Sequence, residues 1–336
     1  MPKPLVSVII SAFNRPAMLL AAINSVQSQT YEQLEIIIQD DSTNGECQRV
    51  VLNLCDSRVR YIHNIPSLGT AANLRAGYRK SSGKYFSTLN DDDLYAPDYI
   101  EQMVERMEAN PRLSLSFCDH YIINHEDDIL TKETEQNTHT WNRDVLQDGI
   151  IEPAIELAIV HKSIPAMFAV FRREFIDLDD FPDEVSSGYD YWLSYLAVRE
   201  GNPIYYTSQR MTYYRVHHDS QTASFSDPLK RLEFSRYSQY IIKKLLSDPR
   251  LDSIHSVLYP RLAGAHASAG FALLQLSHRM KAFKEFMRSL QIRPSASVLA
   301  GLIFCSTPQF ILKLFPKTSR LTRSRKSLAF ESRVLS

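Results

Sequence analysis

Residues 84–97 read KYFSTLNDDDLYAP, a stretch in which an apolar, aromatic run is followed at once by three carboxylates. The run KYFSTL has the composition of a buried strand, and Asp91, Asp92 and Asp93 come directly after its end. Two unit charges about 4 Å apart repel by only roughly 1 kcal/mol in water, so a solvated turn is one interpretation. The other is a site of hard oxygen ligands suited to Mg²⁺ or Mn²⁺.

The sequence before this stretch alternates strands with helices. Residues 5–11 (LVSVIIS), 34–38 (LEIII) and 58–63 (RVRYIH) are short runs of strand character. Segments with apolar residues at helical spacing lie between and after them, among them AMLLAAINSVQSQ and GTAANLRAGYRKS. The alternation predicts a parallel α/β sheet, whose ligands bind at the carboxyl ends of the strands. Three polar clusters fall at those ends: residues 11–14, 40–43 and 90–93.

The pattern changes twice in the second half of the chain. The strand LSLSFCDHYIIN reaches Asp119 and His120, for which an acceptor contact and an internally satisfied polar pair are both open. Residues 125–148 are polar and mixed in charge, which predicts a loop. From about Leu229 only helical patterns remain. We therefore expect three parts: an α/β domain over 1–228, a helical hairpin over 229–294, and an apolar then basic tail over 295–336.

The composition excludes several classes of protein. Of the 336 residues, 44% are hydrophobic and 23% charged, as in soluble globular proteins, and the formal net charge of +0 indicates no nucleic-acid partner. The four cysteines show no Cys-x-x-Cys spacing, which favours a reducing cytoplasm over a disulfide framework. The first strand leads into SAFNRPAM rather than a glycine-rich phosphate loop. A phosphate-bearing ligand is therefore expected to need a metal.

Three segments in order carry a family resemblance: VSVIISAFNRPAMLLAAINSVQSQTYEQLEIIIQDDST, GTAANLRAGYRKSSGKYF and LNDDDLYAPDYIEQM. Over roughly residues 4–223 the chain resembles the family-two inverting glycosyltransferases of the GT-A fold. The resemblance implies an α/β catalytic domain with a mixed, mainly parallel central sheet, followed here by a helical appendage. It implies transfer of a hexosyl or N-acetylhexosaminyl group from a nucleoside-diphosphate sugar, most simply a UDP-sugar. The implied acceptor is a saccharide or a lipid-linked one, as in bacterial surface-polysaccharide synthesis, and the implied cofactor is Mn²⁺ or Mg²⁺.

The resemblance also assigns residues to the donor site. Ser11 and Phe13 lie where the family contacts the nucleobase and ribose, with Phe13 replacing a frequent Tyr. Asp41 matches the carboxylate that hydrogen-bonds the uracil. Asn73 matches a polar position near the nucleotide, although helix capping or packing would explain it equally well. Asp91 is then expected near the ribose.

The expected metal ligands are Asp92, Asp93 and His217. Asn90 stands where many members of the family have Asp, so which of the two aspartates is the main ligand stays open. His217 falls where many members have a histidine near the diphosphate, and a neutral imidazole can ligate a metal. The alternative for His217 is a surface pair with His218.

Asp190, in SSGYDYWLSYL, matches the position of the family's catalytic carboxylate. Such a base removes the proton of the acceptor hydroxyl and typically contributes roughly 10² to 10⁴ in rate. Tyr189 replaces a customary Glu, which leaves one carboxylate in the motif. The alternative role for Asp190 is to interact with the dipole of the helix that it begins.

Two further hypotheses concern the tail and the activity. Residues 297–326 are apolar and then basic, which fits either peripheral contact with an anionic membrane or a helix packed on the catalytic domain. A nucleotidyltransferase is the alternative enzyme, although SAFNRPAM lacks the glycine-rich, basic triphosphate loop that it would normally show. A non-catalytic nucleotide-sugar-binding scaffold is the other alternative, kept open by Asn90 and Tyr189.

Overall fold

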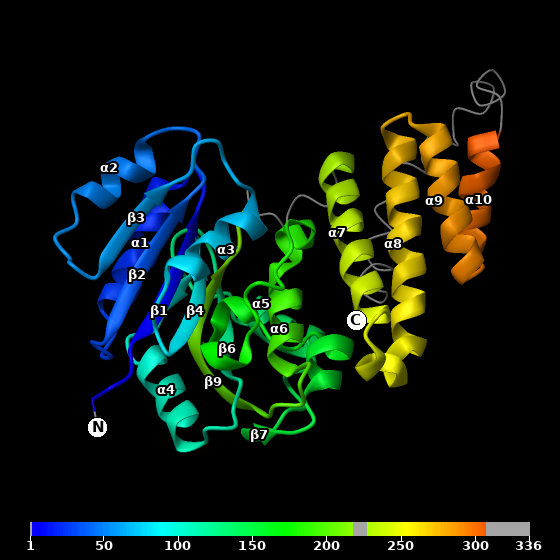
Figure 1. The fold of residues 1–336 in the computed structure, drawn as a ribbon. Coiled ribbons are helices and arrows are strands. Elements are labelled where there is room, and N and C mark those ends of the chain that lie inside the picture. Colours follow the sequence, from blue (N-terminus) through cyan, green and yellow to red (C-terminus); the bar gives the residue numbers. More distant parts are fainter. Residues whose placement is uncertain (1, 218–226, 307–336) are drawn as a thin grey trace. The chain divides into compact units, whose positions relative to one another are not determined.

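The computed structural model describes residues 2–217 and 227–306. The chain divides between His217 and His218 into two compact units. The first is an α/β unit and the second is built from helices (Figure 1). Each unit is described by itself.

The α/β unit contains nine strands and six α-helices among its described residues. The strands are β1 (Val6–Ala12), β2 (Leu34–Asp40), β3 (Val59–His63), β4 (Tyr85–Asn90), β5 (Leu94–Tyr95), β6 (Leu115–Ile123), β7 (Gly149–Ile151), β8 (Ala169–Arg172) and β9 (Ile204–Arg215). The helices are α1 (Pro16–Gln27), α2 (Glu46–Leu52), α3 (Thr70–Lys80), α4 (Tyr99–Ala109), α5 (Thr131–Thr140) and α6 (Tyr189–Val198). Short helical turns are η1 (Glu156–His161), η2 (Ala166–Phe168), η3 (Arg173–Phe175) and η4 (Asp183–Gly188).

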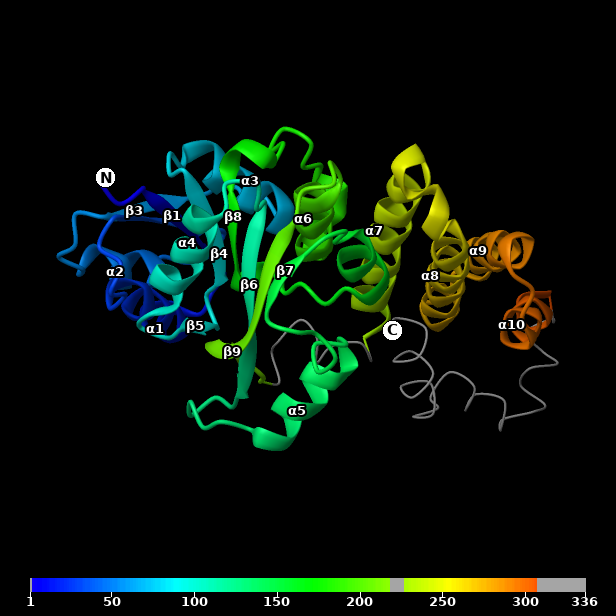
Figure 2. The same ribbon diagram turned by 90° about the horizontal axis from the view of Figure 1, so that it is seen from below.

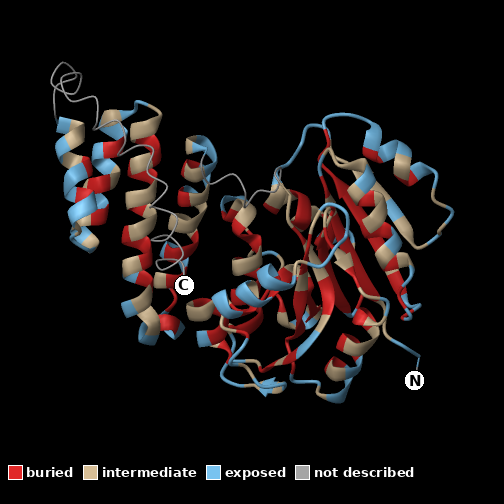
Figure 3. Ribbon diagram, turned by 180° about the vertical axis from the view of Figure 1, so that it is seen from behind, coloured by how far each residue is buried: buried red, intermediate tan, exposed pale blue. Residues whose placement is uncertain are grey.

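The strands form one mixed sheet in the order β3-β2-β1-β4-β8-β6-β9-β5, with β7 paired to β9. The neighbours β3, β2, β1 and β4 are parallel, as are β6 and β9, whereas β8 runs antiparallel to both of its neighbours. This arrangement confirms the expected mixed, mainly parallel sheet. Burial is concentrated in the central strands (Figure 3), which explains why their sequences are almost continuously apolar.

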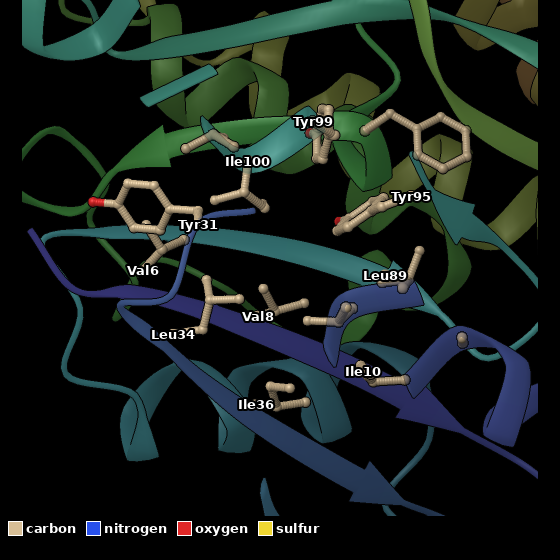
Figure 4. Close-up of a cluster of buried hydrophobic side chains, with 14 of the residues drawn as sticks. Val6, Val8, Ile10, Tyr31, Leu34, Ile36, Leu89, Tyr95, Tyr99 and Ile100 are labelled. Atoms are coloured by element: carbon tan, nitrogen blue, oxygen red, sulfur yellow. The ribbon is translucent and has the colours of Figure 1, made fainter. Parts of the chain in front are cut away.

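The core of this unit lies on both faces of β1. On one face, Val8 pairs with Ile36 of β2, and both pack in a cluster that Tyr95 and Tyr99 complete (Figure 4). On the other face, α3 approaches so closely that a Cβ at Gly77 would lie 2.6 Å from Ile9 Cγ2. Each fully buried aliphatic side chain contributes roughly 1.5–3 kcal/mol, so packing on both faces stabilises this part of the sheet.

The structure differs from the sequence-based expectation in residues 125–148. A loop was expected there, but residues 131–140 form α5, which follows the end of β6 (Figure 2). The helix is held by hydroxyls rather than by an apolar stripe: Thr134 Oγ1 accepts from Ile122 N at 2.9 Å, and Thr138 Oγ1 donates to Asp119 at 2.7 Å. Apolar periodicity therefore gave no indication of it.

The helical unit contains four α-helices among its described residues. They are α7 (Pro228–Leu246), α8 (His255–Gln275), α9 (Arg279–Ile292) and α10 (Ala296–Ser306), with a 3₁₀ turn η6 (Pro249–Ile254) before α8. Phe286 of α9 packs against Gly270 and Gly301, where a Cβ would lie 2.5 and 2.6 Å from its ring. Residues 296–306, assigned by sequence to the tail, thus form a helix of this core, while residues 307–326 lie outside the described residues. None of the helices in the described ranges has the length and apolar character to cross a membrane.

Candidate functional site

Three loops converge at the carboxyl edge of the parallel strands. Ser11 of β1 pairs with Gln39 of β2 on one side and with Asn90 of β4 on the other. The polar clusters that follow these strands therefore lie side by side, as parallel register requires. Phe13 projects from this edge with 49% of its surface exposed, so it is open to a ligand.

Arg15 ties two of the three consecutive aspartates together. Its Nη1 lies 2.9 Å from Asp91 Oδ1 and 2.5 Å from Asp92 Oδ2. Asp91 Oδ2 also accepts a hydrogen bond from the backbone of Phe13 at 2.8 Å. Burial raises the pKa of Asp91 to about 7, with a further upward contribution from Asp92 and an opposing one from Arg15. Asp92 also lies 3.1 Å from Nε2 of His217, so two of the expected metal ligands meet.

Asp93 is engaged differently from its neighbours. It is completely buried, Oδ1 accepts from the backbone of Arg215 at 3.0 Å, and Oδ2 accepts from Nδ2 of Asn90 at 3.0 Å. Burial, followed by the charge of Asp92, raises the pKa of Asp93 well above its usual range. Arg215 Nε in turn donates to the carbonyl of Asp92 at 2.8 Å. Asp93 thus fastens the acidic turn to β9, and Asp92 is left as the carboxylate beside His217.

The two departures from the family pattern contact each other. The hydroxyl of Tyr189, at the start of α6, donates to Oδ1 of Asn90 at 2.8 Å. Asn90 therefore accepts from Tyr189 while it donates to Asp93. An amide can do both, whereas an ionised carboxylate only accepts. The two hydrogen bonds, from Tyr189 to Asn90 and from Asn90 to Asp93, link α6 to the acidic turn.

Asp41 and Asn73 belong to a second network, which holds the loop before α3. Asp41 Oδ2 accepts from the backbone of Leu68 at 3.1 Å and of Gly69 at 2.8 Å, and Gly69 has the positive φ of +83° that this turn requires. Asn73 is 1% exposed, and its Nδ2 donates to Ser11 Oγ at 3.2 Å and to the carbonyl of Gln39. The structure therefore brings Ser11 and Asn73 together, and it favours the packing role for Asn73.

Asp190 lies in the first turn of α6, and its Oδ1 accepts from the backbone of Tyr191 at 2.7 Å. Burial raises the pKa of Asp190, while the Tyr191 N–H and the charge of Lys162 act in the opposite direction. A carboxyl with a raised pKa is a stronger base at neutral pH. Within residues 2–217 no hydrogen bond or ion pair joins Asp190 directly to the acidic turn, and the connection runs through Tyr189.

A divalent cation fits this edge only if a ligand completes its coordination. The described residues contain no preformed group of three metal-ligating side chains. Asp92 and His217 offer one oxygen and one nitrogen donor at a shared point, and the Arg15 guanidinium already balances the carboxylates as a cation would. Mg²⁺ and Mn²⁺ commonly bind one or two protein ligands together with phosphates and water. The donor set therefore fits a metal that arrives with a diphosphate.

The structure shows different surroundings for the two neighbours Asp119 and His120. Asp119 is buried and accepts from Arg143 Nε at 2.8 Å and from Thr138, so it is internally satisfied. Burial, with a further contribution from Arg143, lowers the pKa of His120 to about 3, and its Nδ1 has no hydrogen-bond partner in the described structure. Neither side chain reaches the acidic turn through a hydrogen bond or ion pair among the described residues. Sequence reasoning missed Arg15 and Arg215. The only sequence signals for them were that Arg15 directly follows the polar cluster 11–14 and that Arg215 lies two residues before His217.

Known proteins resemble this chain in sequence and in fold. Residues 7–178 match the family model described as Glycosyl transferase family 2. A relative from Escherichia coli, WfaP, named UDP-Glc:alpha-D-GlcNAc-diphosphoundecaprenol beta-1,3-glucosyltransferase, is 27% identical over 224 residues, covering 66% of this chain and 80% of WfaP.

Two solved structures share the fold. Staphylococcus aureus TarS 1–349 in complex with UDP-GlcNAc superposes with a TM-score of 0.63 at 14% identity, covering 90% of this chain and 89% of that one. A mannosyltransferase from Pyrobaculum calidifontis, in complex with GDP-Man and Mn²⁺, gives 0.55 at 16% identity, covering 99% and 85%. At such identities the likeness shows the fold alone. Because the family match spans just over half of the 336 residues, the protein belongs to glycosyl transferase family 2 and is a glycosyltransferase of the GT-A fold.

Proposed function

We propose that the chain is an inverting glycosyltransferase that takes its sugar from a UDP-sugar with a divalent cation bound. The observation that carries this proposal is the meeting of Asp92 Oδ2 and His217 Nε2 at 3.1 Å, in the acidic turn whose Asp91 accepts a hydrogen bond from the backbone of the exposed Phe13. A cation bound there supplies positive charge to the diphosphate of the donor. Phe13 offers an apolar face to the nucleoside, and Arg15 holds Asp91 and Asp92 in place.

We propose that Asp41 does not contact the base itself but holds the loop of residues 64–69 that does. Its carboxylate oxygens already accept from four groups of residues 64–69, so the loop that it holds, and not a free carboxylate, presents polar backbone to the uracil. Asn73 supports Ser11 in the same way, because its amide donates to the Ser11 hydroxyl. Asp41 and Asn73 thus hold in place the loop and the Ser11 side chain that are proposed to contact the donor.

Asp190 is the proposed catalytic base. It takes the proton of the acceptor hydroxyl while that oxygen bonds to the anomeric carbon, and the bond from this carbon to the diphosphate breaks on the opposite side. The raised pKa of Asp190 supports the assignment, and Tyr189 fixes the first turn of α6 against Asn90. WfaP, by its name, acts on a diphosphoundecaprenol-linked sugar, which supports a lipid-linked saccharide as the acceptor class here.

The test is a turnover assay with several UDP-sugars and polyprenyl-diphosphate-linked sugars, with the anomeric configuration of the product read by NMR. We expect Asp190→Asn to lose turnover but to keep UDP binding. Glu184→Gln, an exposed carboxylate of the preceding turn η4, is the matched control and should retain turnover. Binding without turnover in the unmodified protein would favour a scaffold, and release of pyrophosphate from UTP and a sugar phosphate would favour a nucleotidyltransferase.

A further inference from the structure

The formal net charge of the whole chain is zero, but the two units carry charges of opposite sign. Residues 1–217 carry 19 Lys and Arg against 31 Asp and Glu, whereas residues 227–306 carry 12 against five. The helical unit is therefore strongly basic by itself. Such an asymmetry is typical of a protein whose basic part meets a polyanion or an anionic surface.

Some of these basic residues line a groove in the helical unit. The middle helix α8 packs against both α7 and α9, which form the walls. The cavity has a volume of about 260 Å³, smaller than the roughly 300–1,000 Å³ of sites for drug-sized ligands. Leu232, Ala269 and Leu273 supply its apolar lining. A space of this size suits a headgroup rather than a whole lipid or nucleotide.

Cations line the rim of the groove. Lys281, Lys284 and Arg288 recur at helical spacing along one face of α9, and Arg236 lies on the wall formed by α7. All four side chains are exposed. Arg236, Lys281 and Lys284 have no ion pair within residues 227–306, so their charges are available to a ligand.

Glu285 is the one acid among the described residues that line the groove, and it is already paired. Glu285 accepts from His266 Nδ1 at 2.7 Å and from Arg288 Nη1 at 2.5 Å. Its pKa is lowered, because these contacts outweigh the effect of burial. Glu285 therefore does not offset the charge of the other rim residues, and the groove favours an anion.

Other features of the groove indicate which class of anion it binds. No aromatic side chain is among the described residues that line the groove, so bases have no surface on which to stack. Apolar side chains are exposed at the first turns of both walls: Leu229 of α7 is 63% exposed and Met280 of α9 is 72% exposed. Residues 307–336 carry seven Lys and Arg against one Glu, so charge disfavours this segment as an occupant. An anionic group attached to hydrocarbon matches all of these features.

We propose that this groove binds the phosphate headgroup of an anionic lipid. The rim cations contact the phosphate, and Leu229 and Met280 contact the adjoining hydrocarbon. The residues that line the groove all come before residue 297 in the sequence, so the proposal does not use the tail segment 297–326. The inference does not depend on the transferase chemistry, because it uses no residue of the α/β unit.

The test is co-sedimentation of the full chain with vesicles of phosphatidylcholine, with and without phosphatidylglycerol. The groove variant carries Arg236→Gln, Lys281→Gln and Lys284→Gln. The matched control carries Lys243→Gln, Lys244→Gln and Arg293→Gln, which removes the same charge from the same unit outside the groove. We expect anionic vesicles to bind the unmodified chain, the groove variant to partition at least about tenfold less, and the control to lose less than about threefold.

Equal losses in the two variants, or no binding of the unmodified chain to anionic vesicles, would overturn the proposal. Titration with inorganic phosphate in the absence of vesicles, and with a labelled single-stranded RNA, distinguishes other sources of phosphate. Groove-dependent binding to either one without groove-dependent binding to vesicles would also overturn it. Circular dichroism shows whether each variant is folded, and the single variant Lys281→Gln provides a milder change if the triple variant misfolds. UDP titration of the same variants reports on the α/β unit, so failure of this proposal is distinguishable from failure of the proposed function.

Discussion

Replacing Asn90 by aspartate tests how the acidic turn is held together. Asn90 Nδ2 donates to Asp93 Oδ2 at 3.0 Å, and Asp93 is completely buried. An introduced carboxylate would place a second negative oxygen at that distance with no hydrogen between the two. Two unit charges 4 Å apart repel by about 4 kcal/mol at an effective dielectric constant of about 20. We expect Asn90→Asp to lower the free energy of unfolding by about 3–4 kcal/mol at pH 8.

The loss should depend on pH in a defined direction. Repulsion and burial raise the folded-state pKa of the carboxyl pair above its unfolded value, so the folded state binds a proton more readily. The penalty is therefore present above the folded pKa and is relieved as the pH falls below it. At pH 5 we expect at least about half of the lost stability to return, since each unit of pKa shift corresponds to about 1.4 kcal/mol.

The assay is urea unfolding followed by tryptophan fluorescence, with a chelator present. Both tryptophans, Trp141 and Trp192, lie in the α/β unit, so the signal reports on the unit that carries Asn90. Asn90→Ala is the control, because it removes the amide without adding charge and should cost about 1–3 kcal/mol at either pH. Two results would contradict this prediction: a loss of unfolding free energy for Asn90→Asp no larger than that for Asn90→Ala at pH 8, or an equal loss for Asn90→Asp at pH 5 and pH 8.

Three further predictions address other parts of the α/β unit. Tyr189→Phe removes a buried hydroxyl and should cost about 1–2 kcal/mol in chemical unfolding; kcat should fall while the Kd for UDP in calorimetry stays unchanged. Gly77→Ala places a Cβ 2.6 Å from Ile9 Cγ2 and should cost about 1–3 kcal/mol, seen as a lower Tm, whereas Gly45→Ala, with open space around it, should leave Tm within about 1 °C. The neutral, buried His120 has a folded pKa of about 3, so its unfolded form alone takes up a proton between pH 7 and pH 5; His120→Phe should remove about 2 kcal/mol of the acid-induced loss measured in urea.

The parallel half of the sheet could be predicted from the sequence because its strands are buried on both faces. Residues 5–11 and 34–38 are almost wholly apolar, and they became β1 and β2 within two residues of the expected bounds. Parallel register then placed the polar clusters on one edge. The family resemblance could assign expected roles to residues of these clusters. These predictions rest on local composition and on a general rule of sheet geometry.

The contacts within the site could not be predicted, because they join residues far apart in sequence. Arg15 meets Asp91 and Asp92 across more than 70 positions, and Tyr189 meets Asn90 across 99. Three adjacent aspartates look alike in sequence, yet the turn buries Asp93 completely and leaves Asp92 beside His217. The direction of each side chain depends on tertiary packing, which a linear pattern does not contain.

Calorimetric titration with UDP, with and without Mn²⁺, tests the central claim most directly. The proteins to compare are the unmodified chain, Asp92→Ala, and Asp179→Ala as a control for an exposed aspartate of the same unit. We predict that UDP binds with Mn²⁺ and much more weakly without it, that Asp92→Ala abolishes this dependence on metal, and that Asp179→Ala retains it. Binding of UDP that is equally strong without Mn²⁺, or that survives unchanged in Asp92→Ala, would contradict the assignment of Asp92 and His217 to a metal-dependent donor site.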